Sequence, residues 1–420
     1  MVVDRLKAGV AECEITCPIG LELAAELAPR VSRGVRTPLM ARALVLSDSQ
    51  EMLAVVTLDL FGLQPEAAEK LAAGIAGRCG LKPGGVMVLC SHTRGAPCTT
   101  PVVGWPGVHE DYLVEVVARV PEVVRAAQER LEDASLGVGH ALLPHLVYNH
   151  RLMTRNMKAI SAWMGVPRDE VLAPEGPIDP QFSVLVVRDS RGRPLCLLWH
   201  FAADNRFAAD DQISAGLSYL VQQELDERLG RHVPCLYLAG CGGNVSCAHG
   251  LEETADAVTS AVMAVQLETP CDPTIRLGCA AERVVLPIRD YAQFWSQADV
   301  ELKAPQALQA YARELALLQQ EGAHAVPTSV QVFRLGRFAL AGLPGMPFVE
   351  LALAIRERSP FQATLVAGNA GGYVGYVIPR AAFEHQGFES WPARSSRVGP
   401  GGGEFMVEEA IGLLQGLRKG

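Results

Sequence analysis

Residues 41–90 decide the fold, and they read ARALVLSDSQEMLAVVTLDLFGLQPEAAEKLAAGIAGRCGLKPGGVMVLC. Two apolar runs, residues 41–46 and 53–58, have the length and composition of buried strands. Residues 65–78 repeat apolar side chains at a spacing of three to four, which is typical of an amphipathic helix, and residues 85–90 are a further apolar run. Strands that alternate with a helix in this way predict an α/β architecture.

The same style of pattern continues to the end of the chain, with glycines and prolines between the elements. It predicts helices at residues 111–132, 218–228, 252–266, 291–321, 347–357 and 404–419. It predicts strands at residues 182–187, 195–199, 234–239, 331–335, 338–341 and 362–366. The stretch from 152 to 177 is less regular, and the turn cluster at 176–180 is a candidate sub-domain seam.

The composition excludes several classes of protein. Hydrophobic residues make up 49 % of the 420 residues and charged residues 20 %, which excludes a disordered chain. With 37 Lys and Arg against 46 Asp and Glu, the net charge is −9, so the chain lacks the positive field that gathers nucleic acid. No run of the sequence approaches the roughly 18 apolar residues of a membrane span.

The N-terminus and the cysteines indicate a compartment. Residues 1–16 contain no apolar segment of the kind found in secretory signals. None of the 11 cysteines forms a CxxC pair, so we expect reduced thiols in a cytoplasmic protein rather than a structural zinc knuckle. The expected partner is a small-molecule substrate, with neither nucleic acid nor a membrane, and homo-oligomerisation is left open.

Four polar loops stand out among the predicted elements. They read CSHTRGAPC (90–98), WHFAADN (199–205), LAGCGGNVSC (238–247) and GGYVGYVIP (371–379). Ligands of open α/β sheets bind beyond the carboxyl ends of strands, so we expect these loops to form a polar cleft. The glycines of the third loop allow close approach of the backbone, and its amides could bind an oxyanion; no Lys-Ser/Thr follows, so it is not a Walker motif. Each loop taken alone is equally compatible with a capped surface turn.

In this order the loops resemble the catalytic region of the neutral/alkaline non-lysosomal ceramidase family, nearly end to end. The matching stretches are AGVA (8–11), IT (15–16), PLMARALVL (38–46), CSHT (90–93), YNHR (148–151), ISA (213–215), GCGGN (240–244), GLPG (342–345), residues 369–379 and EHQGFE (384–389). The resemblance implies one composite α/β catalytic domain over residues 1–420, with mixed sheets flanked by helices. It also implies that the C-terminal immunoglobulin-like domain of the family is absent.

Members of this family are zinc amidases that split the N-acyl bond of a sphingoid lipid. Their metal is held by two His, a Glu in a Pro-Gly-Glu turn and a Tyr in a Gly-Tyr segment. Carried over by position, the first His is His92 and the Tyr is Tyr376, whereas the second His falls on Asp204 and the Glu on Met346. The family's second loop His, near the scissile bond, falls on Arg94.

The altered ligand set predicts an enzyme without the family's zinc. A Met thioether is a poor ligand for Zn²⁺ and suits soft metals, so Met346 weakens the set. The guanidinium of Arg94 disfavours a nearby divalent cation and can itself replace its charge. The resemblance further places Ser246, which matches a family Ser, and Arg151, which matches an Arg that lines the family's pocket, in the same cleft.

The leading hypothesis is a divergent ceramidase-like enzyme that acts on an amide, acyl or other carbonyl group of a small soluble metabolite. Its predicted catalytic residues are His92, Arg94, Asp204, Ser246 and Tyr376. His92 would act as acid or base and be oriented by Asp204. Ser246 or Cys98 is the candidate nucleophile if the reaction needs one, and Arg94 and Arg151 would hold a carboxylate or polarise a carbonyl.

A second group of residues is predicted to bind the substrate. It consists of Arg151, Gly243, Asn244, Cys98, Tyr373 and Met346. Cys98 is also the alternative nucleophile. The long chains of ceramide need an apolar groove at a membrane surface, and the sequence has no basic amphipathic anchor helix, so a soluble biosynthetic intermediate or small amide is the expected substrate.

Two alternatives stay open. One is a metal-dependent amidohydrolase in which zinc is held by His92, Asp204 and Tyr376, with help from Asp210, Asp211 or Cys241. The other is a non-catalytic binding protein that retains the fold.

Overall fold

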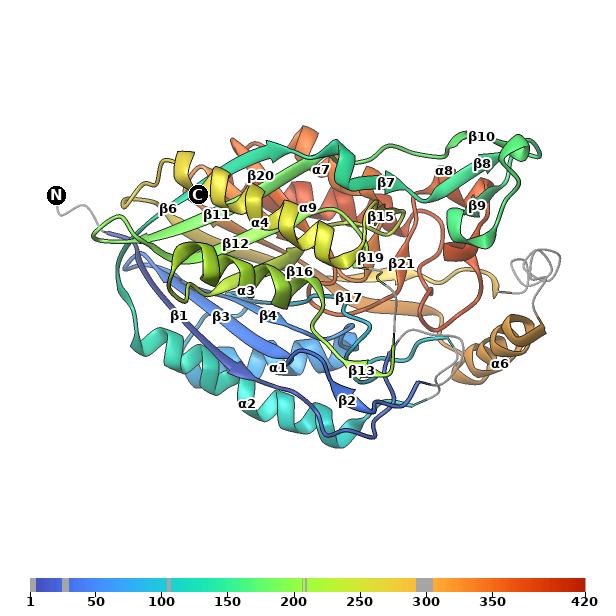
Figure 1. The fold of residues 1–420 in the computed structure, drawn as a ribbon, viewed down its shortest axis with the longest axis horizontal. Coiled ribbons are helices and arrows are strands. Elements are labelled where there is room, and N and C mark those ends of the chain that lie inside the picture. The colour runs from blue at the N-terminus through green and yellow to red at the C-terminus, as the bar shows by residue number, and fades with distance from the viewer. Residues whose placement is uncertain are drawn as a thin grey trace.

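An eight-stranded sheet is the largest element of the structure, a computed structural model that describes residues 5–24, 30–103, 107–205, 207, 210–291 and 305–419. Its strand order is β14-β12-β11-β6-β1-β3-β4-β5, and Figure 1 labels the six inner strands. The strands are β1 (Lys7–Glu14), β3 (Met40–Ser47), β4 (Met52–Leu58), β5 (Val86–Cys90), β6 (Glu132–Leu142), β11 (Gln181–Asp189), β12 (Pro194–Phe201) and β14 (Cys235–Ala239). The pairs β4·β5 and β12·β14 are parallel and the others antiparallel, so the sheet is mixed.

Four helices cover one face of this sheet. They are α1 (Pro65–Cys79), α2 (Glu110–Glu129), α3 (Leu217–Leu229) and α4 (Leu251–Glu268). Successive side chains of a strand point to opposite faces, and β3 follows this rule: Ala43 and Val45 pack with α1 and α2, whereas Leu44 and Leu46 lie in the core on the other side. The near-continuous apolar runs of the sequence thus reflect strands that are covered on both faces.

A second, four-stranded sheet covers the other face. Its order is β16-β17-β18-β20, from β16 (Leu277–Pro287), β17 (Ala325–Leu335), β18 (Phe338–Gly342) and β20 (Ala363–Ala367). Phe333 and Leu340 of this sheet share a core with Met87 and Leu89 of β5. Helices α7 (Val349–Arg358) and α9 (Gly402–Lys419) pack on its outer face, so the chain forms a helix–sheet–sheet–helix sandwich.

Small sheets and short helices gather at one end of the sandwich, on the right of Figure 1. They comprise β7 (Val147–Asn149) with β15 (Val245–Cys247), β8 (Arg151–Thr154) with β9 (Ala159–Ser161) and β10 (Val171–Pro174), β19 (Met346–Pro347) with β21 (Tyr376–Val377), and helix α8 (Arg380–Glu384). Further elements are β2 (Gly34–Val35) with β13 (Gln212–Ile213), helix α6 (Pro305–Glu321), and the 3-10 turns η1 (Pro144–Leu146), η2 (Ala162–Met164), η3 (Arg168–Glu170) and η4 (Phe388–Ser390). None of the helices in the described ranges is long and apolar enough to cross a membrane.

The structure confirms the α/β class and the predicted strands and helices, with four differences. The helix predicted to run to residue 132 ends at Glu129, and β6 begins at Glu132. Strands β1, β6 and β16 were not predicted from periodicity; β6 carries glycines at 137 and 139 because Pro270 and Thr269 lie against its backbone. The irregular stretch 152–177 holds most of β8 and all of β9 and β10. Of the tract 291–321, residues 292–304 lie outside the described part, and α6 begins at Pro305.

Residues 176–180, the predicted sub-domain seam, are joined to neighbouring segments by a hydrogen bond and an ion pair. The carbonyl of Pro177 accepts a hydrogen bond of 2.9 Å from Nδ2 of Asn149. Asp179 is 2 % exposed and forms an ion pair with Arg356 of α7. A Cβ on Gly176 would lie 2.2 Å from Oε1 of Glu350, so this turn lies close against α7.

Candidate functional site

The four predicted loops meet at the end of the sandwich. Isolated bridges join Leu89 to Ala370 and Gly240 to Ala367, and a parallel bridge joins Asp204 to Ser246. Because the edge strands β5 and β14 also lie near each other, the segments that follow β5, β12, β14 and β20 converge. Parallel pairing of β19 with β21 places Met346 opposite Tyr376 in the same region.

His92 is fixed tightly in this cleft. It is 4 % exposed, its Nδ1 lies 2.8 Å from the carbonyl oxygen of Phe61, and its ring packs against those of Phe61 and Tyr373, with centroids 4.0 and 5.6 Å away. Its φ of +60° is uncommon for a residue with a side chain and is held by these contacts. Burial lowers the pKa of His92 to about 4, which Asp204 opposes and Arg94 reinforces, so the imidazole is neutral at physiological pH.

Asp204 pairs with Arg94 rather than with His92. Nη2 of Arg94 lies 3.4 Å from Oδ2 of Asp204, and the two side chains are 11 % and 2 % exposed. The carbonyl oxygen of Arg94 accepts a hydrogen bond of 2.7 Å from Nη2 of Arg30, which holds the loop. Asp204 acts on His92 through its charge, without a hydrogen bond to it. The expected His92–Asp204 pair is therefore replaced by an Arg94–Asp204 ion pair.

Ser246 lies in a chain of buried polar contacts that periodicity did not reveal. Its Oγ is 2.8 Å from Nδ1 of His150, and Nε2 of His150 is 3.1 Å from Oε1 of Glu389. The three residues are 5 %, 1 % and 0 % exposed. Arg151 and a hydrogen bond from His150 outweigh burial and lower the pKa of Glu389 to about 2. An ionised Glu389 accepts the proton of Nε2, which leaves Nδ1 as an acceptor for the Ser246 hydroxyl.

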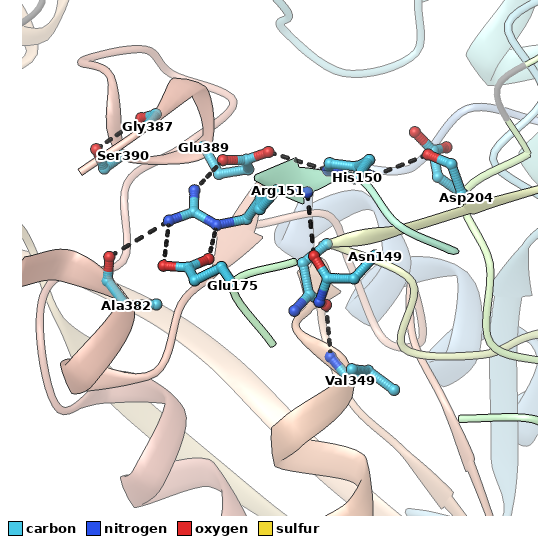
Figure 2. A network of polar contacts seen from close by, with 12 residues as sticks. Asn149, His150, Arg151, Glu175, Asp204, Val349, Ala382, Gly387, Glu389 and Ser390 are labelled. Carbon is cyan, nitrogen blue, oxygen red and sulfur yellow. Dashed lines mark hydrogen bonds and ion pairs between the residues drawn. The ribbon is translucent and has the colours of Figure 1, made fainter. Parts of the chain in front are cut away.

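Arg151 holds Glu389, the last residue in this series of contacts, by an ion pair. Figure 2 shows its guanidinium between Glu175 and Glu389, with His150 beyond Glu389. Its Nη2 also donates to the carbonyl oxygen of Gln386 over 2.7 Å, and the side chain is 1 % exposed. All three guanidinium nitrogens therefore donate to protein oxygens. The predicted substrate-binding residue Arg151 is placed where it orients Glu389.

The glycine loop supports His150 and helix α7. The side chain of Asn244 accepts a hydrogen bond of 2.9 Å from the amide of Val349 and donates one of 2.8 Å to Glu350, so it caps α7, while its carbonyl oxygen accepts the amide of His150. The amide of Gly243 donates to Pro347 over 3.0 Å, and a Cβ on Gly243 would lie 2.5 Å from the carbonyl oxygen of Met346. The structure places Gly243 and Asn244 in packing and capping contacts.

The remaining predicted residues form an apolar wall of the cleft. Cys98, Met346 and Tyr373 are buried in one cluster with Phe61, and Tyr376 packs against it. Cys98 is 1 % exposed, which makes it a core thiol here. Burial raises the pKa of Tyr373 well above its usual range, with the charges of Tyr376 and Asp204 acting in the same direction. The hydroxyl of Tyr373 is therefore neutral.

The donors of the cleft do not fit zinc. The positions expected to hold it supply the imidazole of His92, the phenol of Tyr376, a carboxylate that Arg94 already neutralises, and a thioether at Met346. The other ligands considered point elsewhere: Asp210 and Asp211 pair with surface arginines, and Cys241 contacts the carbonyl oxygen of Val366. No group of three His, Cys, Asp or Glu within the described ranges has the geometry to hold a metal ion.

Two residues of the site, His150 and Glu389, are absent from the predicted set. Both lie in stretches that carry the family resemblance, 148–151 and 384–389, so the sequence alone offered a signal that could have singled them out. The sequence did not reveal that His150 and Glu389 touch, because 239 positions separate them; 96 positions separate His150 from Ser246. A cleft built from such distant segments has no periodic signature in sequence.

Comparison with known proteins identifies the fold. The crystal structure of neutral ceramidase from Pseudomonas aeruginosa superposes with a TM-score of 0.77 at 18 % identity, covering 99 % of this chain and 75 % of that chain. A structure of ceramidase complexed with C2 gives a TM-score of 0.78 at 16 % identity, covering 99 % of this chain and 76 % of that one. No family model and no curated protein matches the sequence. The chain thus has the neutral ceramidase fold, which confirms the resemblance at the level of structure.

Proposed function

We propose that this chain of ceramidase fold is a serine-dependent hydrolase or acyl transferase that acts on an amide or ester bond of a small soluble metabolite. The observation that carries the proposal is the chain of contacts from Ser246 to His150 to Glu389, with distances of 2.8 and 3.1 Å. A hydroxyl, an imidazole and a carboxylate in this order form the arrangement that activates serine nucleophiles on unrelated folds. It stands in the cleft where the donors do not fit zinc.

The positions of the protons on Ser246, His150 and Glu389 support this role. Because Glu389 is ionised and bound to Nε2–H of His150, Nδ1 is free to accept the proton of the Ser246 hydroxyl. The Ser246 oxygen then forms a bond to the carbonyl carbon, and His150 returns the proton to the leaving amine or alkoxide. Water or a second acceptor completes the reaction by the reverse path. Arg151 acts as a positioning residue, since its cation keeps Glu389 ionised.

Arg94 is the group that we assign to the developing oxyanion. Its partner Asp204 is bridged through the backbone to Ser246, so Arg94 pairs with a residue that neighbours the nucleophile. A fixed positive charge in a site shielded from water stabilises an oxyanion strongly. Tyr376 and the neutral His92 line the same cleft and would contact the substrate.

A serine-directed fluorophosphonate probe tests the proposal, together with a panel of p-nitrophenyl esters and N-acyl p-nitroanilides. We expect mass spectrometry to find the probe on Ser246, and Ser246→Ala to lose both labelling and turnover. Ser161→Ala is the matched control, because Ser161 is a buried serine whose Oγ accepts no hydrogen bond from a described residue. Labelling of another residue, or undiminished turnover by Ser246→Ala, would refute the assignment.

The burial of Ser246 favours one competing function, binding without turnover. Its side chain belongs to a residue that is only 5 % exposed, and the cavity beside Asp204 measures about 10 Å³. A binding protein of this kind would resist the probe at every serine and hydrolyse none of the panel. The two functions therefore give opposite results in the same experiment.

A further inference from the structure

A small cavity lies within the cleft. Its volume is about 10 Å³, and its wall includes Ser91, His92, Asp204, Asn205 and Asn369. A space of this size accommodates a single water molecule or a single ion. It joins the segments that follow β5, β12 and β20.

Four oxygen atoms on residues of this wall accept no hydrogen bond from the described part of the chain. They are Ser91 Oγ, Asp204 Oδ1, Asn205 Oδ1 and Asn369 Oδ1. Each belongs to a residue that is at most 6 % exposed. A buried polar atom without a partner is strongly unfavourable, so four such atoms on residues that line one small cavity call for an occupant.

The amide groups cannot relieve this by turning over. Nδ2 of Asn369 donates to the carbonyl oxygens of Phe61 and Cys90 over 2.7 and 3.3 Å. Nδ2 of Asn205 donates to the carbonyl oxygen of Ser91 over 3.3 Å. Exchange of O and N in either amide would set oxygen against oxygen, so both Oδ1 atoms remain acceptors.

Ser91 Oγ carries its own hydrogen, but the other three oxygens only accept, and a water molecule has two hydrogens to donate to them. A cation has no such limit, and oxygen donors are the ligands of hard cations. The charge of the site favours a monovalent ion, since the single carboxylate of Asp204 is balanced by Arg94. Neutral oxygens of Ser and Asn replace the hydration shell of an alkali ion as backbone carbonyls do in potassium channels.

We propose that this cavity binds a monovalent alkali cation, sodium or potassium, through the oxygens of Ser91, Asp204, Asn205 and Asn369. The ion ties together the ends of three strands at the base of the cleft. The inference is independent of the proposed function, because it concerns a resident ion and holds whether or not Ser246 is a nucleophile. The proposed site differs from the family's zinc site in its donor atoms, which are all oxygens, and in the single charge of its ion.

Thermal unfolding at constant ionic strength tests the proposal. Protein exchanged into choline chloride is titrated with NaCl, KCl, MgCl₂ or CaCl₂. We expect the unfolding midpoint to rise and saturate with an alkali ion, as binding to the native state requires. A crystal grown with thallium(I), which mimics potassium, should show an anomalous peak among the four oxygens.

Ser91→Ala is the decisive variant, because it removes one ligand and little else. We expect it to weaken the apparent affinity for the alkali ion by about tenfold. Ser161→Ala, the same change at a buried serine outside the cavity wall, should leave that affinity unchanged. Identical midpoints in choline and alkali salts, a response to divalent ions alone, or no thallium peak would each overturn the proposal and leave a water in the cavity.

Discussion

Replacing Glu389 by Gln separates the electrostatic role of this carboxylate from its shape. Glu389 is 0 % exposed and contacts His150 on one side and Arg151 on the other. Glu389→Gln keeps the volume and one oxygen but removes the charge. Breaking one partner of a buried ion pair costs about 3–5 kcal/mol.

The pKa of Glu389 provides an independent magnitude. A fall from the ordinary value of 4.5 to about 2 corresponds to about 3 kcal/mol of stability when each pKa unit is worth about 1.4 kcal/mol. Because the pKa is lower in the folded state, this stability is fully present above pH 4.5 and is lost as the pH falls through about 2. We therefore expect wild type and Glu389→Gln to differ by about 3 kcal/mol at pH 7 and to approach each other near pH 2.

Urea unfolding followed by tryptophan fluorescence at pH 7, 5, 4 and 3 measures this difference. Glu408→Gln is the control, because Glu408 pairs with Arg358 on the surface and should contribute little at any pH. A difference between Glu389→Gln and wild type that stays constant over the acid range would show that packing, not charge, holds this residue. That result would also remove the basis for an ionised Glu389 in the proposed function.

Three further predictions concern the cleft. Arg94→Ala should lower kcat/KM for any ester or anilide that the wild type cleaves by about 100-fold or more, and Arg94→Lys should recover part of it; wild-type rates in both would remove Arg94 from the reaction. Gly243→Ala should lower the free energy of unfolding by about 1–3 kcal/mol, because its Cβ would lie 2.5 Å from a backbone oxygen. The control Gly412→Ala in α9 places a Cβ where no atom lies within 4 Å, so it should not destabilise the protein; equal effects of the two changes in calorimetry would contradict this. Iodoacetamide at pH 8 should leave Cys98 and Cys247 unmodified in the native protein, since Cys98 is 1 % exposed and burial raises the pKa of the Cys247 thiol to about 12. Rapid alkylation of Cys98, seen by mass spectrometry, would restore Cys98 as a candidate nucleophile.

The elements that the sequence predicts well are those with a one-sided or uninterrupted apolar pattern. Helix α1 and strands β3, β4 and β5 follow such patterns within a residue or two of the expected bounds. Strand β6 was missed because glycines at 137 and 139 lower the strand propensity. Only the packing explains why they are there: the carbonyl oxygen of Pro270 lies against Gly137, and the side chain of Thr269 lies against Gly139. Local pattern therefore predicts an element, while the reason for its exceptions lies in another part of the chain.

The candidate site divides in the same way. The sequence by itself determined that polar loops follow β5, β12 and β14, and it placed His92, Arg94 and Asp204 in one cleft. Only the tertiary structure decided which groups touch: Asp204 pairs with Arg94, and Ser246 and Glu389 meet on His150. The physical reason is that secondary structure depends on neighbours a few residues apart, whereas a hydrogen bond between residues 150 and 389 depends on how two sheets and their loops pack.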